Sequence, residues 1–315
     1  MKKIVLISGV GGSLFPYFIE KLEKKYRLVL IDSNDVVKHT YPNSNIIVVP
    51  SVKDPQYRTV IDKLIRNLHV DYYIPLIDEE ILQAIEIAKT QRNLKLIAPN
   101  QSFVQLCLDK FRLMKKLTQL QISQVLTWRA DRGPARLSFP VFLKPITSRG
   151  SRGARRIDNM EQLQAYFLFE SYSKYDVMIQ EYLEGEEYTV SVAVNNLNHL
   201  IAIVPKQVIL KKGITLHAVT RKNEIISAIC RVIVDKLKPY GPFNVQLKVC
   251  KDQVKIFEVN PRFSTTSVLT CEAGVNEFDL CMKLYGKTSI KEIDSYQEGL
   301  FLYRRWENCF YELKP

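Results

Sequence analysis

Short apolar runs alternate with amphipathic segments over the first 98 residues, and this alternation restricts the possible folds more than any other feature of the sequence. The apolar runs typical of buried strands cover residues 4–8, 27–32, 46–49, 72–76 and 94–98. Helical patterns lie between several of them, at residues 14–25, 57–68 and 79–90. Such βαβ alternation predicts a parallel sheet with helices on both faces.

The remaining two thirds of the chain have a different pattern. Pro99 and Asn100 mark a break, after which one long helical pattern covers residues 104–120. A strand at residues 139–145 then leads into a glycine loop, and the chain is rich in strands from residue 188 onward. We therefore predict an α/β N-terminal parallel-sheet domain (1–98) followed by two α+β lobes (99–183 and 184–315). A ligand site is expected in the cleft between the lobes.

Composition excludes several classes of protein. With 46% hydrophobic and 25% charged residues, the chain is typical of a soluble enzyme. No apolar stretch approaches the roughly 20 residues that span a membrane, and the apolar start at residues 4–8 meets a glycine turn instead of a cleavage site. The six cysteines form no C-x-x-C pair and the four histidines are scattered. These features argue against a disulfide framework or a zinc site and favour the cytoplasm.

The net charge of +12 raises the question of an anionic partner. The basic residues are densest at four arginines interleaved with glycines, namely Arg149, Arg152, Arg155 and Arg156. No stacking aromatic residues accompany them, so a phosphate-binding loop is a better interpretation than a nucleic-acid groove. We expect no nucleic-acid or membrane partner, and we interpret the remaining positive charge as a solvated face.

A glycine turn follows the first predicted strand. The segment Ser8-Gly9-Val10-Gly11-Gly12 opens a helix, and Asp32 ends the second strand 20 residues past Gly12. This pattern partly matches a dinucleotide fingerprint, which would indicate an NAD-dependent oxidoreductase. The third glycine of that fingerprint is replaced by Leu14, however. A structural or small-substrate role for the turn is the favoured alternative.

Three oxygen-bearing side chains near residue 260 indicate a magnesium site. In Glu258-Val259-Asn260 the two-residue spacing places both side chains on one face of a strand, and Gln246 can join them from the preceding strand. Carboxylate and amide oxygens are hard ligands that suit Mg²⁺. Arg262 would project beside the metal and neutralise a transferring phosphoryl group.

Three further motifs precede this one. Lys144-Pro145 ends a strand, the loop from Ser148 to Gly153 can bind phosphates through its backbone N–H groups, and the segment from Gln180 to Tyr188 is rich in glutamate. In this order the four motifs resemble the ATP-grasp superfamily. More narrowly, they are similar to the single-copy carboxylate–amine ligases related to the large chain of carbamoyl-phosphate synthase.

The resemblance implies an ADP-forming C–N ligase that uses ATP and Mg²⁺. Such an enzyme joins a small-molecule carboxylate to an amine through an acyl phosphate and releases phosphate. Since relatives are often dimers, a homodimer is a further expectation. A carbamate- or bicarbonate-phosphorylating enzyme is the alternative within the same class.

The resemblance also implies a role for individual residues. The ATP phosphates would be bound by Lys110 and Lys144 and covered by the loop that contains Ser148, Arg149, Gly150 and Ser151. The adenine edge would be held by Glu181 and the backbone of Leu183, and the ribose by Glu187. The metal ligands would be Gln246, Glu258 and Asn260. Arg262 and Lys144 would be the catalytic residues.

The two substrates are less well defined, although the resemblance favours an amino acid. Asp78 and Glu80 lie in an acidic segment that could bind a substrate ammonium group or favour its own helix N-terminus. Lys206 is a candidate for contact with the substrate or the γ-phosphate, or it could equally be surface charge. Arg304 is a candidate to pair with a substrate carboxylate. Ser191 and the segment Ser264-Thr265-Thr266 differ from the acidic and glycine residues common in relatives, so the substrate cannot be copied from one relative.

Overall fold

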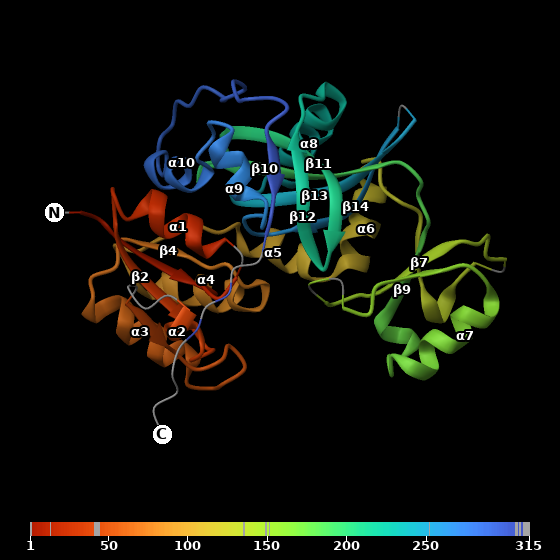
Figure 1. Cartoon of the computed structure of the whole chain (residues 1–315), viewed down its shortest axis with the longest axis horizontal. Helices are drawn as coiled ribbons and strands as arrows, with labels where there is room; N and C mark the ends of the chain where they lie inside the picture. The colour runs from red at the N-terminus through yellow and green to blue at the C-terminus, as the bar shows by residue number, and fades with distance from the viewer. Residues whose placement is uncertain are drawn as a thin grey trace.

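The structure is a computed structural model that describes residues 2–12, 14–40, 45–134, 136–148, 150, 152–251, 253–305, 308 and 310. Within these residues the chain forms three separate sheets, as Figure 1 shows. We call them the first sheet (β1–β5), the small sheet (β6–β9) and the large sheet (β10–β15). No helix in the described ranges is long and apolar enough to cross a membrane.

The first sheet is parallel throughout, with the strand order β3-β2-β1-β4-β5. Its strands are β1 (Ile4–Ser8), β2 (Arg27–Asp32), β3 (Ile46–Val48), β4 (Tyr72–Ile74) and β5 (Lys95–Leu96). Its helices are α1 (Phe15–Leu22), α2 (Val37–Thr40), α3 (Tyr57–Asn67) and α4 (Ile81–Thr90), with a 3-10 turn at Asp78–Glu80. Neighbouring β1 residues belong to different cores, since Ile7 packs in one cluster and Leu6 in another. The predicted parallel sheet, buried on both faces, is confirmed.

The small sheet stands apart from the other two, at the right of Figure 1. Its strands are β6 (Thr127–Arg129), β7 (Val141–Pro145), β8 (Arg155–Ile157) and β9 (Val177–Glu181), in the order β6-β9-β7-β8. Helix α7 (Met160–Phe169) supplies Tyr166 to the core of this unit. Two 3-10 turns, Ala130–Arg132 and Lys174–Asp176, complete it.

The large sheet is antiparallel and has the order β14-β13-β10-β11-β12-β15. Its strands are β10 (Glu186–Val194), β11 (Leu200–Lys212), β12 (Ile214–Thr220), β13 (Gly241–Cys250), β14 (Gln253–Asn260) and β15 (Phe301–Tyr303). One core of this sheet includes residues of α5 (Gln101–Leu108), α6 (Lys110–Gln119) and α8 (Glu224–Leu237). The other includes residues of α9 (Ser267–Glu272) and α10 (Glu277–Lys283).

The single helix predicted over residues 104–120 is wrong, because two helices meet at Asp109. This residue has an extended backbone (φ −102°, ψ 96°), and its side chain accepts a hydrogen bond from the Arg112 N–H at 2.8 Å. Asp109 is therefore the N-cap of α6, a position at which aspartate is favoured. The break places Lys110 at the start of α6, where its N–H donates to the Ile146 carbonyl at 3.2 Å.

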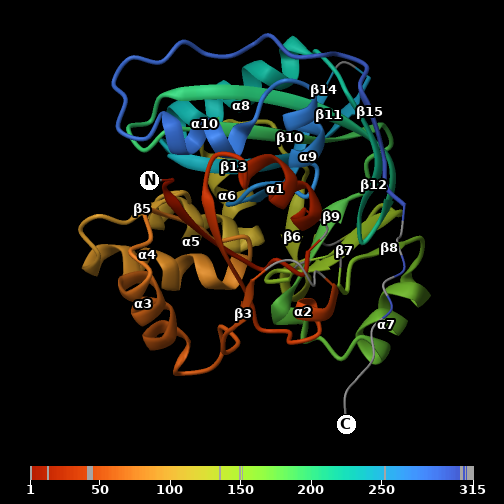
Figure 2. The same cartoon turned by 60° about the vertical axis from the view of Figure 1, so that its left-hand side comes forward.

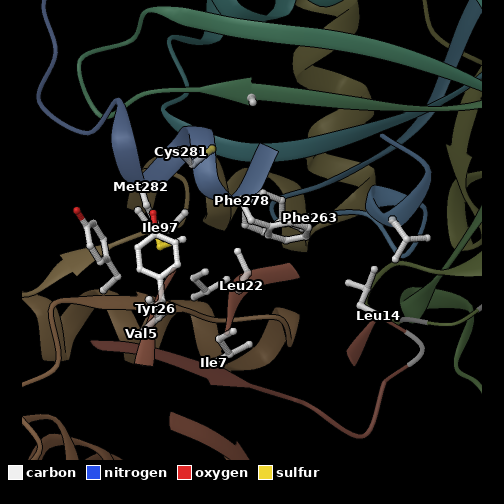
Figure 3. Close-up of a cluster of buried hydrophobic side chains, with 14 of the residues drawn as sticks. Val5, Ile7, Leu14, Leu22, Tyr26, Ile97, Phe263, Phe278, Cys281 and Met282 are labelled. Atoms are coloured by element: carbon white, nitrogen blue, oxygen red, sulfur yellow. The ribbon is translucent and has the colours of Figure 1, made fainter. Parts of the chain in front are cut away.

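The first sheet is docked firmly on the large-sheet unit through one apolar cluster. Figure 3 shows side chains of β1 and α1, such as Ile7 and Leu22, facing Phe263 and Phe278 of the other unit. The two phenylalanine rings lie 4.0 Å apart between centroids. At the edge of the cluster the Tyr26 hydroxyl donates to Asp279 at 2.8 Å. Figure 2, turned by 60°, shows α1 lying next to the large-sheet unit.

Candidate active site

A cavity of about 520 Å³ lies between the small sheet and the large sheet. Its lining comes from β7, the glycine loop, the segment between β9 and β10, and strands β10 to β14. Among the described lining residues five are cationic and three are acidic. The cations are Lys110, Lys144, Lys211, Lys248 and Arg262, and the acids are Glu181, Glu187 and Glu258. This size and this positive excess suit a small anionic ligand.

The three predicted metal ligands all line this cavity. Gln246 on β13 is paired directly with Glu258 on β14, and Asn260 follows on the same face of β14. The Asn260 amide nitrogen donates to the Asn244 side chain at 3.3 Å, which leaves its oxygen free to face a ligand. No three His, Cys, Asp or Glu residues group together as a metal site in the described ranges. This candidate site has one carboxylate and two amide oxygens, a donor set that fits Mg²⁺ with phosphate and water ligands added.

The charge of Glu258 is maintained by its neighbours. Burial acts to raise the pKa of this carboxyl, but the nearby cations Lys144, Lys110, Lys211 and Arg262 together lower it below its ordinary value. The Lys144 ammonium lies 3.6 Å from the Glu258 carboxylate and donates to the Phe257 carbonyl at 2.9 Å. Glu258 is therefore ionised at neutral pH, as a metal ligand has to be.

The glycine loop covers one side of the cavity. Ser148 and Gly150 line it, and the Lys110 ammonium donates to the Ser148 carbonyl. Gly150 has a φ of +64°, in the left-handed region that glycine adopts at little cost. Arg149 and Ser151, which were also predicted to bind phosphate, lie outside the described residues.

The segment that joins β9 to β10 lines the opposite side of the cavity. Leu183 of this segment and Glu187, near the start of β10, both line the cavity, and Glu187 accepts a hydrogen bond from Lys211 at 2.7 Å. Lys211 also donates to the Gln246 oxygen at 3.1 Å, so it links the predicted ribose and metal positions. The Glu181 carboxylate accepts from the Leu126 N–H at 2.9 Å and from Lys255 at 2.7 Å.

Arg262 lines the cavity, and its guanidinium is held from behind by Asp78. The Arg262 Nε donates to one Asp78 oxygen at 2.6 Å, and Nη2 donates to the other at 3.3 Å. Asp78 is 9% exposed and is not among the lining residues. Its carboxylate is therefore already engaged with Arg262 in this structure.

The other three predicted substrate residues lie outside the cavity lining. Glu80 is buried beneath the first sheet, where it accepts from Tyr57 at 2.9 Å, and burial raises its pKa to about 7. Lys206 is 0% exposed and donates to the hydroxyls of Ser191 and Thr270, each at 2.6 Å. Arg304 donates from Nε to the Thr215 carbonyl at 3.0 Å and from Nη2 to the Thr265 carbonyl, next to the cavity wall.

The first glycine turn has a structural explanation. A Cβ at Gly9 would lie 2.8 Å from the Ile77 side chain, and one at Gly11 would lie 2.9 Å from Val37. The Gly11 N–H donates to the Asp32 carboxylate at 2.8 Å. Glycine is needed here for close packing, and Asp32 closes the turn of its own domain.

Sequence reasoning missed two lining residues of β13. Asn244 and Lys248 lie two residues before and after Gln246, and all three line the cavity. Lys248 donates to the Leu183 carbonyl at 2.6 Å, and Asn244 donates to the Arg262 carbonyl at 3.1 Å. Both residues could have been predicted from the period of two along a strand, which places Asn244 and Lys248 on the same face as Gln246.

Comparison with known proteins agrees with this geometry. Residues 173–302 match a family profile described as "ATP-grasp in the biosynthetic pathway with Ter operon". The chain is 26% identical to the carbamoyl phosphate synthase large chain of Pseudothermotoga lettingae over 78% of its length, but it spans only 23% of that protein. It is 24% identical to the formate-dependent phosphoribosylglycinamide formyltransferase of Bacillus subtilis, over 94% of this chain and 80% of that protein.

The fold is shared with solved structures. The biotin carboxylase domain dimer of Hydrogenobacter thermophilus 2-oxoglutarate carboxylase, in complex with MgADP, ADP and bicarbonate, matches with a TM-score of 0.74 at 15% identity. The match covers 96% of this chain and 73% of that one. The profile match and the two relatives support an ATP-grasp ligase, and the solved structure shows a shared fold.

Proposed function

We propose that this chain is an ATP- and Mg²⁺-dependent carboxylate–amine ligase that forms ADP and phosphate. The observation that supports this most directly is the convergence of Lys110, Lys144, Glu258, Asn260 and Arg262 on one cavity. These residues come from three segments far apart in the chain, and together they match the needs of a nucleoside triphosphate with its metal.

The reaction has two steps. A carboxylate oxygen attacks the γ-phosphorus of ATP, the bond to the β-phosphate oxygen breaks, and ADP leaves. The amine then attacks the acyl phosphate carbon, the C–O bond to phosphate breaks, and a proton is released as the amide forms. Most of the catalysis in such a reaction comes from positioning and charge stabilisation.

Individual side chains supply that positioning. Gln246, Glu258 and Asn260 would hold Mg²⁺, which when bound neutralises the phosphate oxygens. Lys144, buried beside Glu258, would contact a phosphate oxygen, and Arg262 would stabilise the charge of the transferring group. The loop containing Ser148 and Gly150 would cover the phosphates and keep water from the acyl phosphate.

The acid is recognised, in this proposal, at the end of the cavity near Arg262. Ser264 and Thr265 line this end with hydroxyl groups, and no carboxylate from the acidic segment at residues 78–80 reaches the lining. The site therefore suits a polar, anionic acid. Amino acids are the first compounds to test as acid and as amine.

The test is ADP release from Mg·ATP with a panel of carboxylates and amines. We expect release that depends on both compounds, and we expect Glu258→Ala to lower its rate by more than about 100-fold, the size typical of losing one charge-stabilising group. Glu184→Ala is the matched control, because Glu184 is exposed and lies outside the lining. An unchanged rate in Glu258→Ala would contradict the metal assignment.

Bicarbonate phosphorylation is a second candidate, favoured by the structural match to a bicarbonate-bound biotin carboxylase domain. The same assay separates the two proposals. ADP release that needs bicarbonate and no other carboxylate would support this candidate, whereas release that needs an organic acid would support the ligase.

A further inference from the structure

The ion pair between Arg262 and Asp78 connects two units of the molecule that are 184 residues apart in sequence. Asp78 belongs to the segment that follows β4 of the first sheet, while Arg262 follows β14 of the large sheet. The contact is bidentate, with both carboxylate oxygens engaged. A bidentate pair restricts the rotation of a guanidinium in a way that a single contact does not.

Arg262 keeps N–H donors that are not used within the protein. A guanidinium has five N–H groups. Asp78 takes two of them, and the Phe263 carbonyl takes one from Nη1 at 3.1 Å. Two N–H groups are then left, and Arg262 lines the cavity beside Asn260. Asp78 thus determines which donors remain for an oxyanion in the cavity.

The segment that carries Asp78 is itself well anchored. The buried Glu80 carboxylate accepts the backbone N–H groups of Leu76 at 3.1 Å and Ile77 at 3.3 Å, and the hydroxyl of Tyr57 at 2.9 Å. These bonds fasten the segment just before Asp78 to the core of the first sheet. Glu80 therefore supports Asp78 and has no need to contact the substrate.

The two units cannot easily move apart at this point. The apolar cluster that includes Leu22, Phe263 and Phe278 joins them, and Phe263 is the residue next to Arg262. Asp78 is consequently held at a constant distance from the cavity.

We propose that Asp78 is a positioning residue for phosphoryl transfer, through which the first sheet aligns Arg262 with the γ-phosphoryl group. This inference rests on the proposed function. It assigns the N-terminal unit a direct part in the active site, and it replaces the expectation that Asp78 binds a substrate ammonium group.

The test is an equilibrium measurement that needs no knowledge of the substrates. Calorimetry gives the affinity of the full chain for Mg²⁺ with a non-hydrolysable imido analogue of ATP and, separately, for MgADP. The ratio of the two affinities reports contacts to the γ-phosphoryl group alone. We expect Asp78→Asn to lower this ratio about tenfold, within the range of coupled side chains, with the MgADP affinity unchanged.

A double-mutant cycle distinguishes an effect of Asp78 that acts through Arg262 from an effect that is independent of Arg262. Asp78→Asn, Arg262→Gln and the double variant are compared, with melting temperatures measured for each. If Asp78 acts through Arg262, the double variant has the same ratio as Arg262→Gln alone. Glu79→Gln, which removes one charge from an exposed residue of the same 3-10 turn, is the matched control and should keep the wild-type ratio.

Three outcomes overturn the proposal. If Asp78→Asn keeps the wild-type ratio of the two nucleotide affinities, Asp78 does not position Arg262. The same follows if the two single substitutions each lower this ratio and their factors multiply in the double variant. Failure of the wild-type chain to bind either nucleotide would overturn the proposed function itself, and the positioning role with it. This last result is recognised from the wild-type protein, before any variant is measured.

Discussion

Lys144 shows how burial adjusts a single side chain of the site. The residue is 4% exposed, and burial lowers the pKa of its ammonium to about 8, although the Glu258 carboxylate acts to raise it. Lys110 and Lys211 nearby lower it further. The ammonium is therefore charged at pH 7, but pH 7 is only about one unit below the pKa at which half of it is deprotonated.

The affinity for Mg·ATP should accordingly depend on pH. In the proposed site, phosphate binds the charged form of Lys144, which is lost as pH rises through about 8. Affinity should therefore be nearly level from pH 6.5 to 7.5 and fall by up to about fivefold between pH 8 and 9. Calorimetric titration across this range is the measurement. Lys144→Arg should have a flat profile, because arginine stays protonated. A wild-type profile that is flat to pH 9 would be inconsistent with this account.

At the scale of elements, the break between α5 and α6 places the Lys110 ammonium next to the glycine loop. Asp109 caps α6, and the next residue, Lys110, reaches the Ser148 carbonyl. A continuous helix would have no N-terminus at this point. The cap therefore serves both the stability of α6 and the position of Lys110.

Asp109→Ala should separate these two effects. We expect a loss of about 1 kcal/mol in the free energy of unfolding, typical of an N-cap, together with a several-fold weaker affinity for Mg·ATP. Asn223→Ala is the matched control, since Asn223 caps α8 by accepting from the Ile226 N–H at 3.0 Å and lies outside the cavity lining. Asn223→Ala should lose a similar free energy of unfolding and keep the wild-type affinity for Mg·ATP. Equal Mg·ATP affinities in the two variants would contradict a positioning role for the Asp109 cap.

For the whole molecule, the apolar cluster of Figure 3 joins the first sheet to the large-sheet unit, while the small sheet stands apart. The candidate active-site cavity lies between the large sheet and the small sheet. The two joined units thus form a base on which β13 and β14 carry the proposed metal ligands. Movement of the small-sheet unit would open or close the cavity without disturbing those strands.

Phe278→Ala tests the importance of this docking. Phe278 is 1% exposed and packs on Phe263, so its truncation should cost about 3–5 kcal/mol of unfolding free energy. Denaturant unfolding followed by tryptophan fluorescence and by circular dichroism is the measurement. Phe169→Ala, at an 86% exposed residue, is the control and should change stability by less than about 0.5 kcal/mol. A loss below about 1 kcal/mol in Phe278→Ala would contradict the importance of this cluster.

The parallel first sheet and the grouping of Glu258 with Asn260 were predictable from the sequence, because both follow from local periodicity. Alternation along a strand is a property of the backbone, so Glu258 and Asn260 had to share a face. The ordered motifs also indicated the ATP-grasp class, and the family match supports it.

Contacts between distant residues required the tertiary structure. No local pattern distinguishes Asp78, which reaches Arg262 from another unit, from Glu80, which is buried under the first sheet. Lys206 on an apolar strand could equally have pointed into the cavity, yet it is enclosed by Ser191 and Thr270. Whether a given charged side chain contacts a ligand depends on how the units dock against each other. Docking in turn depends on apolar residues more than 200 positions apart in the sequence, such as Ile7 and Phe278.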